Sequence, residues 1–246
     1  SYHGLELKVE RRFAEGLSFL ASYTWSRAID NGASGFFTAE NGPGGESYVQ
    51  DFYNLENNKG VSGYNIPHML SVATVWEIPA GKGYPVFNKG PARWILGNWS
   101  LNSLVQLRSG QPTNLVVGGD VANIGNGVGW WSYMRPNVVG NPKVDNRTSG
   151  RWFDPSAFAI PQFGSYGNAG RGIVYSENVT VVDLSLFKRF GWGEGRWVEL
   201  RAELFNFFNL ANYGTPDPYV GSPSMGMIFS TVVPMRQAQL GFKIVF

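Results

Sequence analysis

The 246-residue chain has no cysteine and only two histidines. A disulfide scaffold and a thiolate metal site are therefore excluded. His3 and His68 lie at the ends of different expected strands, so a histidine-based metal site or catalytic triad is not indicated either. Charged residues make up 15% of the chain, whereas about 25% is usual in soluble proteins. The net charge is only +2, and without a run of Lys or Arg we expect no nucleic-acid partner.

Long apolar segments are also missing. No run approaches the roughly 18 apolar residues that a transmembrane helix needs, and the period of a helix is nearly absent from the chain. What the chain has instead is glycine, at 32 residues, and aromatic side chains, at 15%. A low content of charge together with many glycine and aromatic residues suits a protein whose surface contacts something other than water.

The last residues of the chain, 236–246, follow a period of two. The apolar set is Ala238, Leu240, Phe242, Ile244 and Phe246, and the residues between them are Gln237, Gln239, Gly241 and Lys243. A period of two indicates a strand with one apolar and one polar face. A strand that ends on an aromatic residue is typical of an outer-membrane barrel, although the last strand of a soluble sandwich also fits this pattern.

Similar alternation predicts further long strands, with segments at 2–12, 17–30, 67–79, 98–112, 177–190 and 197–209. In the first of them, Leu5, Leu7 and Val9 share one face, and the other face carries Glu6, Lys8, Glu10 and Arg12. Unpaired charges cannot be packed into a dry core, so this charged face must contact water.

The connections between these segments alternate between short and long, at about 4, 35, 18, 60, 6 and 25 residues, as in an up-and-down barrel with short periplasmic turns and long extracellular loops. We therefore predict an all-β fold: an antiparallel up-and-down transmembrane β-barrel, present as an incomplete arc of about seven long strands with long extracellular loops. Residues 1–246 would form the C-terminal part of a single barrel domain.

Aromatic residues fit the same frame. The inner strand ends carry Trp76, Trp99, Trp192, Trp197 and Phe246, and the outer end of the second strand carries Tyr23 and Trp25. Two girdles are expected where rings lie among lipid headgroups. The alternative is that these rings only pack in a β core.

Seven segments, taken in order, carry a family resemblance: YHGLELKVERRFAEGLSFLASYTWSRAID, PHMLSVATVWEIPAGKG, GNWSLNSLVQLRSGQP, FGSYGNAGRG, VDLSLFKRF, VELRAELFNFFNLANYGTPD and RQAQLGFKIVF. Over nearly its whole length the chain resembles the C-terminal barrel of TonB-dependent outer-membrane receptors. The subgroup it is most similar to is the Oar-like receptors, whose N-terminus carries a carboxypeptidase-regulatory-like domain. The resemblance implies a barrel of about 22 strands filled by a plug, with the plug and the first strands outside the sequence. It also implies a β-signal read by the barrel-assembly machinery, formed here by Gln239, Gly241, Phe242, Ile244 and Phe246.

The clearest candidates for chemistry are two carboxylates, Glu199 and Glu203, which lie on one strand face with Arg201 between them. Such a pair could act as general acid and base in a glycosidase. With an intervening arginine, a ladder of charges facing the lumen is the favoured interpretation. We therefore expect no enzyme activity, no cofactor and no metal.

The loop from 113 to 172 is the best candidate for ligand contact. It contains two clusters of aromatic and arginine residues, one formed by Trp130, Trp131, Tyr133 and Arg135 and one that includes Arg151 and Trp152. Clusters of this kind suit sugars, peptides or chelates. They could equally hold the loop across the barrel mouth.

These interpretations predict part of a TonB-dependent receptor in the outer membrane of a Gram-negative bacterium. It would take up a scarce solute, whether siderophore, oligosaccharide or peptide. Its partners would be outer-membrane lipid, the TonB complex and the barrel-assembly machinery. One alternative is a surface adhesion or peptide-interacting barrel of the Oar type. The other is a secreted β-sandwich carbohydrate-binding module or hydrolase.

Overall fold

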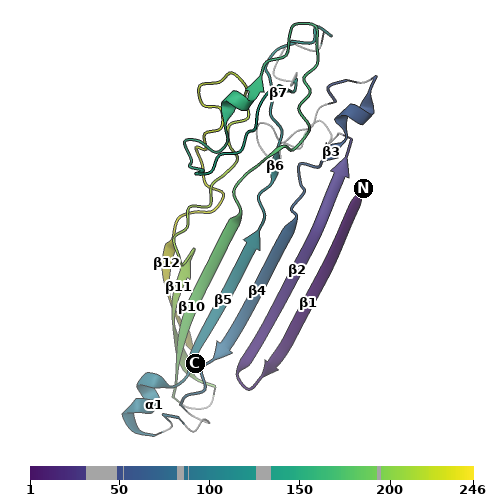
Figure 1. The fold of residues 1–246 in the computed structure, drawn as a ribbon. Coiled ribbons are helices and arrows are strands. Elements are labelled where there is room, and N and C mark those ends of the chain that lie inside the picture. The colour runs from purple at the N-terminus through teal and green to yellow at the C-terminus, as the bar shows by residue number, and fades with distance from the viewer. Residues whose placement is uncertain (32–48, 52, 82–85, 88, 126–133, 193–194) are drawn as a thin grey trace.

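The computed structural model describes residues 1–31, 49–51, 53–81, 86–87, 89–125, 134–192 and 195–246. One antiparallel sheet dominates it, with the strand order β1-β2-β4-β5-β10-β11-β12. The strands are β1 (Tyr2–Ala14), β2 (Leu17–Asp30), β4 (His68–Glu77), β5 (Trp99–Arg108), β10 (Val179–Gly191), β11 (Trp197–Phe205) and β12 (Gln237–Val245). Figure 1 shows these long strands side by side. A β-sandwich is therefore wrong, because the long strands form one sheet.

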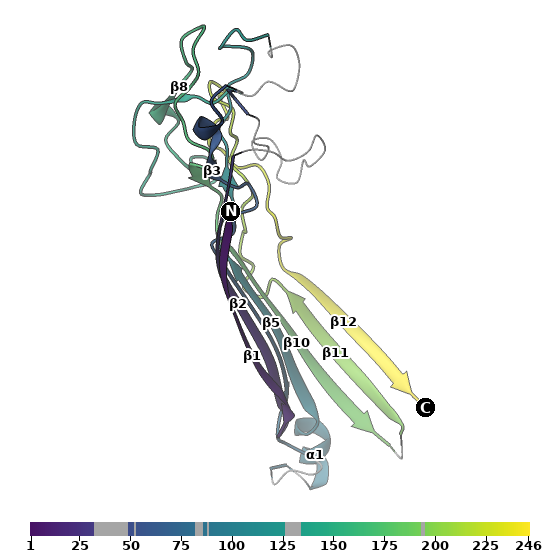
Figure 2. The same cartoon turned by 90° about the vertical axis from the view of Figure 1, so that its right-hand side faces the viewer.

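Every long neighbour in this sheet is also the next long strand along the chain, which is the up-and-down order that the loop lengths predict. The tightest connection joins β1 to β2 through Glu15 and Gly16, both at positive φ, where glycine carries little steric cost. At the outer edges, β1 and β12 pair with no further strand among the described residues. The sheet is thus an open arc, which Figure 2 shows bending away towards β12.

The register assigns every side chain to a face, because residues directly opposite each other in an antiparallel pair point to the same side. Ala21 pairs with Val72, Val72 with Val105 and Val105 with Val182. These residues form an apolar row across four strands. One position along, Ser22 pairs with Ser71 and Ser71 with Gln106, so the opposite face is polar.

Most of the buried apolar side chains lie outside this sheet, in the long connections. The connections gather at one end of the strands (Figure 1) and fold into a cap. The cap's short elements are η1 (Leu55–Asn58), β3 (Gly60–Val61), β6 (Pro112–Thr113), β7 (Asn137–Val138), η2 (Pro155–Ala157), β8 (Phe158–Ala159) and β9 (Val174–Tyr175). The cap's main apolar cluster consists of Leu115, Trp152, Phe153, Ala157, Phe158, Val174, Met225 and Ile228. A second cluster around Val117 and Met134 lies beside it.

The short turns lie at the other end of the strands, together with the seven-residue helix α1 (Gly90–Leu96). The sequence pattern predicts an irregular connection at 80–97, so α1 is an element that periodicity does not reveal. In the ranges that the structure describes, no helix is long and apolar enough to cross a membrane.

Candidate functional site

The polar face of the sheet carries a cluster of charges near the end with the short turns. Arg189 and Arg201 flank Glu199 on neighbouring β10 and β11. Arg189 Nη2 donates to Glu199 Oε2 at 2.8 Å, and Arg201 Nε donates to Glu199 Oε1 at 2.6 Å. Both guanidinium groups also stack on rings of the same face, Arg189 over Trp197 at 4.6 Å and Arg201 over Phe187 at 4.8 Å.

This geometry favours the charge ladder over the acid–base pair. The Glu199 side chain is 3% exposed and accepts hydrogen bonds from both arginines. Both oxygens of this carboxylate are therefore engaged by arginine side chains. Glu203 lies opposite Ser185 on one side and Gln239 on the other. The arrangement is a structural ladder of polar residues on the inner face.

We expect Glu199→Gln to destabilise the sheet, because two charge-assisted bonds are lost while both arginines remain. The arginine side chains are partly exposed and keep some hydration, so the expected cost is about 1–3 kcal/mol. The matched variant Glu203→Gln, on the same strand face, should change stability by less than about 0.5 kcal/mol. The temperature at which the folded band disappears on an unboiled gel measures both effects. Equal midpoints for the two variants would contradict the central role of Glu199.

Trp197 requires a correction to the expected aromatic girdle. Its register places it on the polar face with Glu199, and Lys243 Nζ lies 5.1 Å from its ring centroid. Its position at a strand end is as predicted, but its side chain does not face lipid. Trp76 and Trp99 do lie on the apolar face, in register with Leu101 and Lys188 respectively.

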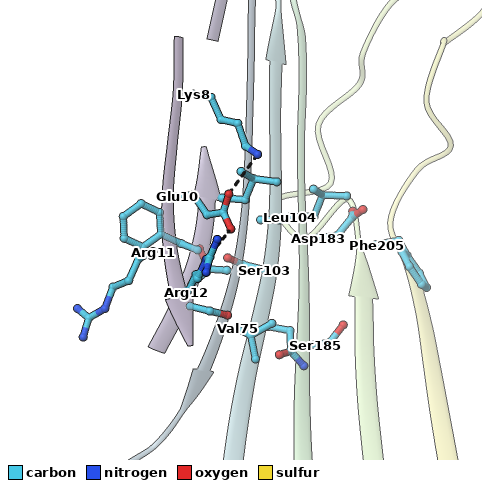
Figure 3. Close-up of a pocket in the computed structure, with 16 residues that line it drawn as sticks. Lys8, Glu10, Arg11, Arg12, Val75, Ser103, Leu104, Asp183, Ser185 and Phe205 are labelled. Carbon is cyan, nitrogen blue, oxygen red and sulfur yellow. Dashed lines mark ion pairs between the residues drawn. The ribbon is translucent and has the colours of Figure 1, made fainter. Parts of the chain in front are cut away.

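An open hollow of about 620 Å³ lies further along the same polar face. Its charged residues include Lys8, Glu10 and Arg12, joined by ion pairs of 3.1 Å between Lys8 Nζ and Glu10 Oε2 and 4.0 Å between Arg12 Nε and Glu10 Oε1. Asp183 faces them across the hollow from β10, and apolar side chains such as Leu104 complete the lining (Figure 3). The predicted charged face of the first strand therefore forms one wall of an open hollow that apolar side chains also line.

Two buried arginines hold the cap together, and one of them, Arg171, also ties it to the sheet. Arg171 pairs with the Asp30 carboxylate at the end of β2, and its Nη1 donates to the Asn58 carbonyl oxygen at 3.1 Å. Arg135 Nη2 donates to the Asn57 carbonyl oxygen at 2.9 Å. Burial, and then the nearby Arg171 charge, lower the pKa of Arg135 below its usual value. The sequence analysis missed Arg171, because its partner lies more than a hundred residues away.

The structure places three of the six predicted ligand-contact residues. Trp130, Trp131 and Tyr133 lie outside the described residues. Arg135 and Trp152 are buried, and Trp152 Nε1 donates to the Tyr175 carbonyl oxygen at 2.7 Å. Arg151 is largely exposed and pairs with Asp154 at 3.4 Å between Nη2 and Oδ1. Of these three, only Arg151 offers a free surface to a ligand, and ligand contact stays a prediction.

The expected assembly signal falls on β12 and the residue after it. Gln239 and Gly241 lie on the polar face, where Gly241 is opposite Arg201. A Cβ at Gly241 would lie 3.3 Å from Arg201 Cβ, so a larger residue would crowd the ladder. Phe242, Ile244 and Phe246 are exposed, as is Leu240 before them. The alternation predicted for this segment is confirmed, and its role as a signal stays a prediction.

Comparison with known proteins gives one match. A family model described as an outer membrane beta barrel domain matches residues 1–239. That range takes in β1 to β11 and the start of β12. Neither the curated proteins nor the solved structures that were searched contain a match to the chain. Among the described residues, no three His, Asp or Glu side chains are grouped so that they could hold a metal ion.

Proposed function

Because the chain belongs to the family of outer membrane beta barrel domains, we propose that it forms part of the wall of a TonB-dependent receptor. The protein lies in the outer membrane of a Gram-negative bacterium, with the apolar face of the sheet against lipid. The proposed receptor takes up a scarce solute, which could be a siderophore, an oligosaccharide or a peptide. It acts by binding and passage, not by catalysis.

The open sheet is the observation that carries this proposal. β1 and β12 pair with no further strand among the described residues, yet in lipid every backbone polar group needs a partner. Closure of the ladder therefore requires further strands. Small barrels of about eight strands are filled by their own side chains, whereas barrels of about 22 strands enclose a lumen that holds a plug.

The polar face supports a wide lumen. Lys8 and Arg12 are mostly exposed, and the hollow that they line is open. Charged side chains in this state need water or a polar domain opposite them. In the proposed receptor that domain is the plug, and the TonB complex of the inner membrane acts on it. Assembly into the lipid is the task of the barrel-assembly machinery, which reads the end of β12.

The cap supports recognition at the outer surface. Its apolar clusters and the Arg171–Asp30 ion pair hold the described parts of the long loops in place above the strands. A pre-formed surface loses less entropy on binding than a free loop does. Arg151 and the aromatic residues at 130–133 are the proposed contacts for the solute.

Solute depletion from the medium tests the proposal. Cells that express the full-length protein are grown in a chemically complex medium with TonB present or deleted, and small solutes are followed by mass spectrometry. The expected result is that one class of solute is depleted only when both the protein and TonB are present. Depletion that does not depend on TonB would exclude a TonB-dependent receptor while leaving a barrel in place.

A second candidate is a surface barrel that binds other cells or peptides. The cap exposes large apolar side chains, among them Tyr53, Phe163 and Phe229, and exposed aromatic residues often mark contact surfaces. Adhesion of this kind needs no TonB. Cell–cell aggregation that is lost with the protein but unchanged without TonB would favour this candidate.

A further inference from the structure

Helix α1 and its flanks form an unusual surface at the end of the sheet with the short turns. Its described residues, 86–87 and 89–98, include Lys89 and Arg93 and no Asp or Glu. The helix buries none of its residues. Trp94, Ile95 and Leu96 are exposed one after another, and Val86 and Phe87 beside the helix are exposed as well. A surface that is both apolar and basic is unusual where only water is expected.

The helix is fastened to the lipid-facing side of the wall. Trp99 Nε1 donates to the Ile95 carbonyl oxygen at 2.9 Å. Lys188 Nζ donates to the Gly97 carbonyl oxygen just past the helix end, where the helix dipole favours a cation. Trp99 and Lys188 are cross-strand partners on the apolar face. The C-terminal end of α1 therefore lies on that side of the sheet.

Lys188 is the positioning residue in this arrangement. It is buried, although it lies on the apolar face, and its Nζ is 5.3 Å from the Trp99 ring centroid and 5.0 Å from that of Phe190. A lone cation on a lipid-facing surface is costly near the bilayer centre and tolerated near its edge. Its position marks the edge of the lipid-facing band, and α1 lies directly beyond it.

We infer that α1 is an interfacial anchor on the periplasmic leaflet of the outer membrane and that it binds anionic glycerophospholipid. Trp94, Ile95 and Leu96 insert at the boundary between headgroups and acyl chains, as amphipathic segments do. Lys89 and Arg93 lie over the phosphate groups, which attract basic residues close to a membrane. The surface is continuous with the lipid-facing band of the sheet, and its charge is opposite to that of the lipid.

Spin labelling measures the depth of α1. Since residues 1–246 contain no cysteine, Ile95→Cys introduces a single label site within this sequence. Ile95 is 65% exposed. The control is Glu15→Cys in the β1–β2 turn at the same end of the sheet, and Trp94→Cys provides a second site in case the first variant misfolds. The full-length protein is reconstituted in phosphatidylcholine vesicles with and without phosphatidylglycerol.

The expected result is that the α1 label collides more with oxygen, which is soluble in lipid, than with a water-soluble nickel chelate, while the Glu15 label shows the reverse. The inference would be overturned if the chelate reached the label at Ile95 as readily as it reaches the label at Glu15. Protection from both collision partners would also overturn it, because the helix would then be covered by protein.

The lipid charge is tested with Lys89→Gln/Arg93→Gln. This double variant should make the α1 label shallower in vesicles with phosphatidylglycerol and leave its depth unchanged in phosphatidylcholine alone. The matched control, Lys59→Gln/Lys143→Gln, removes two exposed cations from the long connections at the opposite end and should leave the depth of the label unchanged in both kinds of vesicle. A depth independent of phosphatidylglycerol would overturn the binding of anionic headgroups. Neither outcome depends on TonB, so this inference and the proposed receptor can fail separately.

Discussion

Leu240→Arg is expected to block assembly of the protein in the outer membrane. Leu240 is 86% exposed near the middle of β12 and lies opposite Ala202 on the apolar face. An arginine that faces lipid near the bilayer centre costs about 2–4 kcal/mol. Mutant and parent are compared by the amount of protein in the outer-membrane fraction and by its mobility on a gel with and without boiling.

The neighbouring residue supplies a matched control, because Gln239→Arg introduces the same charge one position away. Gln239 lies on the polar face opposite Glu203, where an arginine can remain hydrated and meet a carboxylate. We expect this variant to assemble at a level close to that of the parent. If both variants fail equally, or both assemble normally, the assignment of the two faces is wrong.

Phe153→Ala is expected to loosen the cap without harming the barrel wall. Phe153 is 3% exposed and meets Phe158 edge to face, with 5.8 Å between the ring centroids. Removing a buried phenyl ring typically costs about 3–5 kcal/mol. Protease added to intact cells should then cut the long loops of the variant much faster than those of the parent. The mobility of the unboiled protein on a gel, which reports the folded barrel, should stay unchanged.

Phe163→Ala is the control for this effect. Phe163 belongs to the same loop but is 78% exposed, so its removal leaves no cavity and should not alter the rate of cleavage. Equal protease sensitivity of the two variants would mean that the cap is not held by its apolar clusters. Loss of the folded barrel in Phe153→Ala would mean that cap and wall do not fold separately.

The wall of the molecule could be predicted well from the sequence. All seven long strands occur where alternation places them, and β2 has the predicted bounds. The reason is physical. In a strand between lipid and a polar lumen, apolar and polar side chains must alternate, and this alternation can be recognised in the sequence of each strand. The ends of the strands are predicted less accurately. The fourth predicted segment reaches Pro112, whereas β5 ends at Arg108.

The cap and α1 could not be predicted in the same way. The cap depends on contacts between distant loops, such as the backbone bond from Ile228 N to the Ser149 carbonyl oxygen at 2.7 Å. Contacts of this kind leave no period in the sequence. Helix α1 is too short for a helical period to be recognised. The face of Trp197 was misjudged because an aromatic residue at a strand end suits either a girdle or a cation partner.

A cysteine scan of β4 tests the central claim most directly. β4 lies between β2 and β5, and the absence of native cysteine from residues 1–246 allows one fluorescent label at a time. In vesicles that contain a quencher attached to lipid, we predict strong quenching at the apolar-face positions 70, 72, 74 and 76 and weak quenching at 71, 73 and 75. Quenching that is uniform along β4, or absent from it, would contradict a sheet that separates lipid from a polar lumen.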